Sequence, residues 1–287
     1  MSDLPRLTTE QQALVQTWLP EYELVADLSW GQMDTAVLHL RTAEGDRIVK
    51  AGGAENHHIG REIAAHLGFT GPWVKEGRAA RLLRHDDRAN LLLLDYLPGV
   101  LVQETAAEAD PAVYRQAGAI LAAFHAQGAR LDDAYEARMN QKMLGWLDRS
   151  HRIAPETVDR LRANLLSAEP EPVVLVPTHG DWHPRNWLID DGTVRAIDFG
   201  RFDWRPAFTD FARLAVRQFR AKPALEAAFL EGYGADPRTP ERWRMLLLRE
   251  AIGTAVWAYQ VGDETFEAEG HRMIENVLSA EMGNRKE

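Results

Sequence analysis

The spacing of apolar residues changes once along this chain, at Tyr96-Leu97-Pro98-Gly99. Before that point, apolar residues gather in short runs with the length and composition of β-strands. These runs lie at residues 22–28, 35–41, 47–50, 73–84 and 90–96. The run Leu91–Leu94 is apolar without alternation, which is typical of a strand buried on both faces. The first third of the chain is therefore predicted to be rich in β-structure.

Helical spacing dominates after the Pro-Gly pair. Short helices are also expected near residues 8–19 and 57–67, and longer ones at 112–127 and 241–261. Three strand-like runs interrupt the helical part, at 173–176, 187–189 and 194–197. We therefore expect an α+β, two-lobed fold, with a small β-rich lobe over residues 1–97 and a larger, mainly helical lobe over 98–287.

The segment Thr178–Asn186 is dense in polar side chains, although apolar runs flank it on both sides. A turn in that position presents its side chains at the end of a small sheet. Asp198 follows the next apolar run, so Asp181, Asn186 and Asp198 are predicted to converge.

These three residues suit phosphoryl transfer. In that reaction the protein mainly orients a hydroxyl group and holds metal ions against phosphates. Asp181 is a carboxylate that can orient the hydroxyl and accept its proton. Asn186 and Asp198 offer the hard oxygen ligands that Mg²⁺ prefers, so we predict them to be its ligands.

The same segment resembles the catalytic loop of kinases. That loop has a histidine, then any residue, then an aspartate, and an asparagine follows five positions after the aspartate. Asp198-Phe199-Gly200 resembles the metal-binding Asp-Phe-Gly of these enzymes. With Gly180 and with His183-Pro184, the loop is similar to that of the aminoglycoside phosphotransferase and choline kinase family rather than that of protein kinases. The resemblance implies a protein-kinase-like fold with Mg²⁺ as cofactor and ATP or GTP as co-substrate.

Two further segments resemble the same family in the same order. They are Leu121–Ala126, in the predicted helix before the loop, and Asp210-Phe211-Ala212, after the metal-binding motif. The family also implies a lysine on the third strand, paired with a helix glutamate, that holds the nucleotide phosphates. Lys50 and Glu62 are the expected pair, and Glu55 is a weaker rival for the glutamate.

The expected phosphate-covering loop, Ser29–Thr35, departs from the family because it contains one glycine instead of several. The hydroxyls of Ser29 and Thr35 are nevertheless candidates for approaching phosphate, and an ordinary hairpin is the other interpretation. Backbone groups of the hinge, at Asp95 and Leu97, are expected to bind the nucleotide base. The choice between ATP and GTP stays open.

Two residues of the catalytic loop have open interpretations. His183 stands where protein kinases place a lysine, and either touches the transferred phosphate or braces the loop. Arg185 either reaches phosphate, which suits a guanidinium, or points to solvent.

The acceptor of the phosphoryl group is predicted to be a small molecule bearing a hydroxyl. A formal net charge of −10 suits a cationic acceptor and argues against non-specific nucleic-acid binding. Solubility alone is the other explanation for an acidic composition of this size. Glu250 and Trp257 fall on one face of the predicted helix 241–261, and Asp203 and Trp204 follow the metal-binding motif. These four residues are the candidates for binding the acceptor.

Several features bear on location and partners. The chain has no cysteine, no apolar stretch of roughly 18 residues that could span a bilayer, and no basic-then-apolar start of a secretory signal. We therefore expect a cytoplasmic protein with neither a membrane nor a nucleic-acid partner. The sequence leaves its oligomeric state open.

The leading hypothesis is a kinase that phosphorylates a hydroxyl of an antibiotic, aminoglycoside-like or another hydroxylated natural product, and so confers resistance. The alternative is a metabolic kinase of a sugar, a choline-like or an amino-alcohol acceptor. A more remote alternative is a metal-dependent hydrolase built on the histidines and aspartate of residues 179–183, and another is a catalytically silent binding module.

Overall fold

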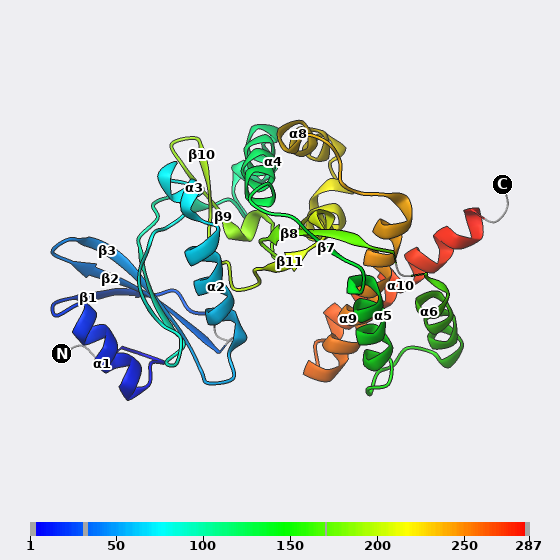
Figure 1. The fold of residues 1–287 in the computed structure, drawn as a ribbon, viewed down its shortest axis with the longest axis horizontal. Coiled ribbons are helices and arrows are strands. Elements are labelled where there is room, and N and C mark those ends of the chain that lie inside the picture. Colours follow the sequence, from blue (N-terminus) through cyan, green and yellow to red (C-terminus); the bar gives the residue numbers. More distant parts are fainter. Residues whose placement is uncertain (1–3, 31–33, 170, 285–287) are drawn as a thin grey trace. The chain divides into compact units, whose positions relative to one another are not determined.

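The computed structural model describes residues 4–30, 34–169 and 171–284, and the chain divides into two compact units (Figure 1). The first unit comprises residues 1–128, 176–205 and 213–236. The second comprises residues 129–175, 206–212 and 237–287. The expected lobe boundary between residues 97 and 98 lies inside the first unit, so that boundary stays a prediction.

The first unit is built on a five-stranded antiparallel sheet with the strand order β1-β2-β3-β5-β4. Its strands are β1 (Glu23–Asp27), β2 (Thr35–Thr42), β3 (Gly45–Gly52), β4 (Leu82–Asp86) and β5 (Leu91–Asp95). All four leucines of β5 are buried, as its unbroken apolar run predicts. Successive side chains of a strand point to opposite faces, so this central strand feeds two separate hydrophobic clusters.

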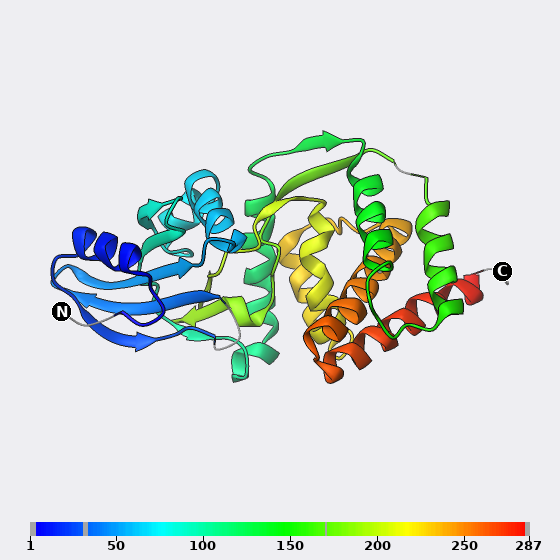
Figure 2. The same ribbon diagram turned by 90° about the horizontal axis from the view of Figure 1, so that it is seen from below.

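Helices cover the two faces of this sheet. Leu91 and Leu93 pack in the cluster of helix α1 (Thr9–Trp18), which Figure 2 shows in dark blue along the blue strands. Leu92 and Leu94 pack in the cluster of helix α2 (His57–Gly68). Lys50 of β3 pairs with Leu92, so the lysine side chain lies on the face that α2 covers.

Helix α1 begins as its sequence predicts. The Thr8 hydroxyl accepts a hydrogen bond from the Gln11 amide at 3.2 Å, and the Gln11 side chain accepts one from the Thr8 amide at 3.0 Å. This reciprocal capping box satisfies backbone groups that a helix start leaves unpaired.

The strand predicted over residues 73–84 is wrong except at its last three residues. Residues 71–75 form the short helix α3 (Gly71–Lys75), and β4 begins only at Leu82. Pro72 lies in the first turn of α3, a position where its missing N–H costs nothing. Trp73 is buried and donates its indole N–H to the Ile120 carbonyl at 3.1 Å, so tertiary packing fixes a segment whose apolar residues alone suggest a strand.

The rest of the first unit places the polar segment between small sheets. Strands β9 (Trp187–Asp190) and β10 (Thr193–Ala196) form a hairpin that β6 (Val100–Leu101) extends. The end of β8 (Val173–Thr178) pairs with β11 (Asp203–Arg205). The strands predicted near 173–176, 187–189 and 194–197 are thus confirmed, whereas β6 and β11 escaped prediction because they are two and three residues long.

Helices α4 (Pro111–His125) and α8 (Pro223–Tyr233) lie side by side in the first unit (Figure 1). Each presents a glycine to the other helix. A Cβ atom at Gly118 would overlap the Phe229 carbonyl oxygen, and one at Gly232 would overlap the Arg115 carbonyl oxygen. The two backbones therefore approach more closely than side chains would allow. A short helix, α7 (Ala212–Leu214), and a π-helical turn (Ala215–Phe219) precede α8 in the chain.

The second unit is mainly helical, with β7 (Arg130–Asp132) pairing with the start of β8. Its helices are α5 (Tyr135–Trp146), α6 (Pro155–Ser167), α9 (Pro240–Val261) and α10 (Glu264–Asn284). They share one hydrophobic core that includes Met143, Leu161 and Leu248. No helix within the described ranges is both long and apolar enough to cross a membrane. The sheet and the helices together confirm the α+β prediction.

Candidate active site

The catalytic loop predicted at residues 179–186 begins where β8 ends. His179 is buried, its Nδ1 accepts a hydrogen bond from the Asp181 amide at 3.3 Å, and its Nε2 lies 3.1 Å from the Ile197 carbonyl oxygen. An acceptor at Nδ1 and a donor at Nε2 fix one neutral tautomer of the imidazole. His179 thereby ties the loop to the end of β10.

Gly180 allows the loop to turn there. Its φ is +80°, in the left-handed region that favours glycine, and a Cβ atom would overlap the carbonyl oxygen of Arg201. The histidine-glycine-aspartate form of the loop thus has a steric cause in this chain.

Asp181 points its carboxylate at basic groups. Its side chain is 9% exposed, and its Oδ1 lies 2.9 Å from Nη1 of Arg213 and 3.4 Å from Nε2 of His183. Neither contact has good hydrogen-bond alignment at Oδ1, so both are electrostatic pairings. Burial opposes ionisation, but His183 and the Arg213 charge outweigh it and hold the pKa of Asp181 below its usual range. Asp181 is therefore an anion at neutral pH.

Asn186 and Asp198 meet at the open end of the β9–β10 hairpin. The last pair of the ladder is Trp187 with Ala196, and beyond it the Ile197 amide donates to the Asn186 carbonyl at 3.1 Å. The Asn186 side-chain amide donates to the Asp181 carbonyl at 2.8 Å, so its nitrogen faces the catalytic loop and its oxygen is available as a ligand. The register of one hairpin brings the predicted metal ligands together beside Asp181.

Asp198 has a strained backbone with φ of +64°, of the kind that persists at functional sites. Its side chain is 45% exposed, and its Oδ1 lies 3.7 Å from Nζ of Lys50. Burial acts against ionisation, but the Lys50 charge outweighs it and lowers the pKa of Asp198. This anionic, accessible carboxylate and the amide oxygen of Asn186 fit Mg²⁺, which binds one or two protein oxygens and takes its other ligands from phosphates and water.

Within residues 4–30, 34–169 and 171–284, no group of three or more histidine, aspartate and glutamate side chains is arranged to hold a metal ion.

Lys50 and Glu62 form a buried ion pair. Nζ of Lys50 lies 2.7 Å from Oε1 and 2.9 Å from Oε2 of Glu62, and both side chains are almost inaccessible to solvent. Burial would lower the pKa of Lys50, but the charges of Glu62 and Asp198 outweigh it and raise that pKa, so the lysine is cationic. The rival Glu55 is exposed. The pairing implied by the family resemblance is thus present in the geometry, and its nucleotide-binding role stays a prediction.

Two histidines of α2, His58 and His66, also belong to this region. Nδ1 of His58 lies 2.9 Å from the Gly200 carbonyl oxygen and so links α2 to the segment after Asp198. His66 lies one helical turn beyond Glu62, with its ring edge against Phe199. Burial and the Lys50 charge lower the pKa of His66 to about 3, so its imidazole is neutral.

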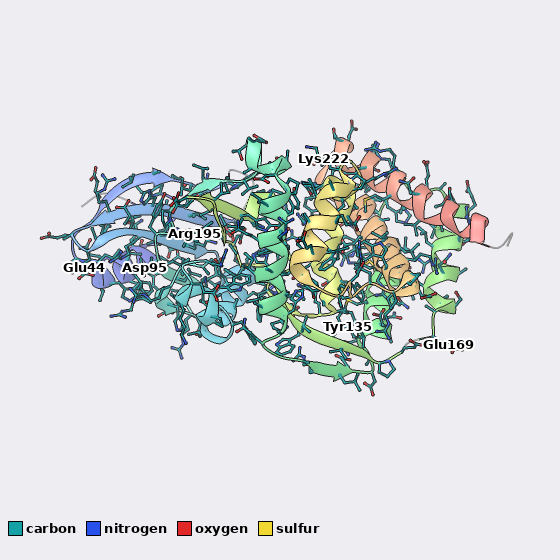
Figure 3. All side chains as sticks on the ribbon, turned by 90° about the horizontal axis from the view of Figure 1, so that it is seen from above. Glu44, Asp95, Tyr135, Glu169, Arg195 and Lys222 are labelled. Carbon is teal, nitrogen blue, oxygen red and sulfur yellow. The ribbon has the colours of Figure 1, made fainter. Side chains whose placement is uncertain are left out.

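The predicted hinge residues differ in what their side chains do. The Asp95 carboxylate, labelled in Figure 3, lies 2.9 Å from Nε of Arg81 and 3.5 Å from Nη1 of Arg47. Leu97 packs its side chain beside the α2 cluster, and its backbone amide has no hydrogen-bond partner in the described part of the chain. The binding of a nucleotide base by this amide stays a prediction.

The hydroxyls of Ser29 and Thr35 both have structural partners. Ser29 accepts from the Val37 amide at 2.9 Å, and Thr35 accepts from the Asn56 side chain at 3.0 Å. The remainder of the predicted phosphate-covering loop, residues 31–33, lies outside the described residues. The role of both hydroxyls toward phosphate stays a prediction.

Arg185 has a ring partner that the sequence did not suggest, and its two interpretations stay open. Its guanidinium stacks on the Trp30 ring, 3.8 Å from the ring centroid, in a cation–π contact between the loop after β1 and the catalytic loop. His183 is buried beside Asp181, which favours bracing of the loop.

Asp203 and Trp204 lie on β11 in the first unit. Asp203 lines a pocket of about 560 Å³ together with Asn56, His57 and Arg61 of the α2 start. Trp204 packs against Phe69 and would meet any Cβ atom added at Gly128. The structure therefore places Asp203 at a pocket and Trp204 in side-chain packing.

Glu250 and Trp257 lie on α9 in the second unit, and both are exposed. Trp257 is 45% exposed and meets Phe266 edge-to-face, with ring centroids 5.9 Å apart. An exposed tryptophan and an exposed carboxylate on one helix face suit a cationic ligand.

Comparisons with known proteins agree with this geometry. A model of the phosphotransferase enzyme family matches residues 34–246. An aminoglycoside 3'-phosphotransferase of Streptomyces fradiae is 36% identical over 170 residues, which are 52% of this chain and 63% of that enzyme's length. The chain thus matches somewhat less than two thirds of that relative.

Solved structures show the same fold. One is a thermostable mutant of aminoglycoside phosphotransferase APH(4)-Ia in a ternary complex with ADP and hygromycin B, with a TM-score of 0.69, 13% identity, and coverage of 95% of this chain and 98% of that one. Another is choline kinase LicA from Streptococcus pneumoniae, with a TM-score of 0.68, 14% identity, and coverage of 94% and 97%. They confirm the predicted protein-kinase-like fold. The family model covers most of the chain and includes every residue of the site described in the first unit from Lys50 to Arg213, and the chain belongs to the phosphotransferase enzyme family.

Proposed function

We propose that this protein transfers the γ-phosphoryl group of ATP or GTP to a hydroxyl group of a small molecule, with Mg²⁺ as cofactor. One observation carries the proposal. Asp181 and Asn186 come from the catalytic loop, whereas Lys50 and Asp198 come from two other stretches of chain, and hydrogen bonds and ion pairs link all three stretches within one unit. A chance cluster of surface residues has no reason to be linked in this way.

Each residue then has a defined task. The acceptor hydroxyl gives its proton to the Asp181 carboxylate as its oxygen bonds to the γ-phosphorus, and the bond from that phosphorus to the bridging oxygen breaks to leave the nucleoside diphosphate. Asn186 and Asp198 would hold Mg²⁺, which neutralises charge on the phosphates when bound. Lys50, oriented by Glu62, faces the same phosphates, and the Leu97 amide binds the base.

For the acceptor, we propose an antibiotic of the aminoglycoside type or another hydroxylated, amine-bearing natural product, whose phosphorylation confers resistance. The named relative acts on aminoglycosides, and the solved neighbour holds hygromycin B. The net charge of −10 and the acidic residues Asp203 and Glu250 are compatible with a cationic acceptor. A reaction that consumes nucleoside triphosphate also fits the cytoplasmic location expected from the sequence.

A metabolic kinase with a choline-like acceptor is the second candidate, because choline kinase shares the fold and an exposed tryptophan suits a quaternary ammonium group. The two candidates share all residues that serve the triphosphate. They differ only in which acceptor is turned over.

The decisive experiment measures nucleoside diphosphate formation with ATP or GTP, with and without Mg²⁺, in the presence of hygromycin B, a second aminoglycoside, choline or a simple sugar. Phosphorylation of an aminoglycoside supports the first candidate, and phosphorylation of choline supports the second. If no hydroxyl compound becomes phosphorylated under any condition, the kinase proposal fails.

The Asp181→Ala variant is the matched control for that experiment. We expect it to lose turnover while it keeps its affinity for nucleotide, because Asp181 serves the acceptor side. Retained turnover would remove Asp181 from its assigned role. Phosphate release from simple esters with Zn²⁺ and without nucleotide would favour a hydrolase instead.

A further inference from the structure

Arg213 is the residue at the site that phosphoryl-transfer chemistry leaves without a task. Its Nη1 lies 2.9 Å from Oδ1 of Asp181, and its side chain is 35% exposed. The segment that carries it is anchored on both sides, because Phe211 before it and Leu214 after it are fully buried. The guanidinium is therefore held at the catalytic aspartate by packed neighbours rather than by a free surface loop.

The two oxygens of the Asp181 carboxylate have different surroundings. Oδ1 is the oxygen that lies closest to both Arg213 and His183, whereas Oδ2 accepts no hydrogen bond from any residue that the structure describes. A nearly buried carboxylate that is pulled from one side has a preferred rotation about its Cβ–Cγ bond. That rotation leaves Oδ2 for another donor.

We infer that Arg213 is a positioning residue for the catalytic aspartate: it engages Oδ1 and so presents Oδ2 to the acceptor hydroxyl. This inference rests on the proposed kinase function. The lack of aligned hydrogen bonds at Oδ1 is consistent with it, since orientation by charge requires proximity and not a particular angle.

A π-helical turn, Ala215–Phe219, follows Arg213 directly and closes with the Arg220 amide donating to the Ala215 carbonyl at 3.2 Å. Such wide turns are rare and often occur at functional sites. Arg220 is exposed at the end of this turn and is the matched control, because it has the same side chain in the same segment but no contact with Asp181.

The experiment compares the variants Arg213→Met, Arg213→Lys and Arg220→Met with the wild type in the acceptor assay, and measures nucleotide affinity and thermal stability in parallel. For Arg213→Met we expect kcat to fall ~10- to 100-fold, the size of a small misplacement of a catalytic group. Nucleotide Kd and Tm should stay close to the wild-type values. Arg213→Lys should recover part of the loss, added guanidinium ion should partly rescue Arg213→Met, and Arg220→Met should behave as wild type.

Other outcomes would overturn the inference. An unchanged kcat in Arg213→Met would show that Asp181 needs no such partner. A raised nucleotide Kd with unchanged kcat would assign Arg213 to the phosphates instead. If Arg213→Met does not fold, the comparison of Arg213→Lys with Arg213→Gln tests the inference instead. Only the lysine keeps the positive charge, so an equal kcat in those two variants would overturn the inference. If turnover by the wild type does not depend on Asp181, the proposed function itself is wrong. If the wild type is active and Arg213→Met is equally active, only the inference about Arg213 is wrong.

Discussion

The backbone amide of Ile197 donates a hydrogen bond to the carbonyl of Asn186 at 3.1 Å. This bond continues the β9–β10 ladder by one step and places Asp198, the next residue, beside Asn186. The predicted metal ligands are thus neighbours because of hairpin register, although they lie in different strand ends. Their function as ligands can be tested directly.

If Asn186 and Asp198 hold Mg²⁺, then Asn186→Ala should raise the Mg²⁺ concentration for half-maximal activity by at least about 10-fold, since even the loss of an outer partner of a metal ligand costs that much. Asp198→Ala should lower kcat further, because it also removes the anion that faces Lys50 at 3.7 Å. The measurement is initial rate against Mg²⁺ concentration. Asp191→Asn, at the exposed far end of the same hairpin, is the control. A Mg²⁺ dependence that is the same in all variants would argue against both ligand assignments.

The Lys50–Glu62 pair should show a stability effect and a functional effect that can be separated. Lys50→Met leaves the buried Glu62 carboxylate without its cation, which typically costs ~3–5 kcal/mol of unfolding free energy. Adding Glu62→Leu should restore much of that loss, because an apolar pair replaces the stranded charge. Nucleotide-dependent activity should stay low in both the single and the double variant.

Urea unfolding and the phosphotransfer assay measure these two effects. A double variant as unstable as Lys50→Met would mean that the stranded charge is not the cause. A double variant with full activity would show that Lys50 has no task toward the phosphates.

Gly180 should tolerate no side chain, for two reasons. A matching substitution at Gly192 tests one of these reasons without the other. Alanine at Gly180 carries the cost of a positive φ, about 1–2 kcal/mol, and its Cβ would also overlap the Arg201 carbonyl oxygen. Gly192 has φ of +71° with open space around it, so Gly192→Ala carries the φ cost alone. We expect Gly180→Ala to be the less stable variant and to lose activity, because relief of the overlap moves the loop that bears Asp181. Equal Tm and kcat in the two alanine variants would contradict this account.

The buried, neutral His66 should make stability depend on pH. In the folded state its pKa is about 3, whereas in the unfolded chain it is near 6.5, so the unfolded state binds more protons as pH falls below that value. Above pH ~6.5 His66 is neutral in both states, so the unfolding free energy is at its full value with respect to this residue. As the pH falls from there toward 3, protonation of His66 in the unfolded chain lowers the unfolding free energy. From pH 7 to pH 5 the wild type should lose about 2 kcal/mol of unfolding free energy relative to His66→Asn.

Urea titrations of both proteins at several pH values give this difference directly, because the other titrating groups are common to the two. Parallel stability curves between pH 7 and pH 5 would mean that His66 is protonated in the folded protein or neutral in both states.

Much of the fold follows from patterns that local physics controls. The apolar run Leu91–Leu94 predicts a strand buried on both faces, and all four leucines are buried. The helix expected near residues 8–19 is present as α1, Thr9–Trp18. The run at 73–84 misleads because apolar residues in a short segment suit a strand or a helix equally well. There the burial of Trp73 against α4 decides the outcome.

Some residues of the site were likewise predictable from the sequence, and others were not. The order and spacing of His179, Asp181, Asn186 and Asp198 identify phosphoryl-transfer chemistry from the sequence alone, because that chemistry needs particular side chains at particular separations along two strand ends. The partners of those residues follow no such rule. Arg213 lies 32 residues from Asp181 by sequence number, and nothing in its local pattern separates it from Arg217 or Arg220. Only packing of the segment around Leu214 and Phe219 selects it. The sequence by itself determined which reaction the loop can perform, since side-chain chemistry is local. The tertiary structure decided which charges surround Asp181, since those contacts depend on how distant segments pack.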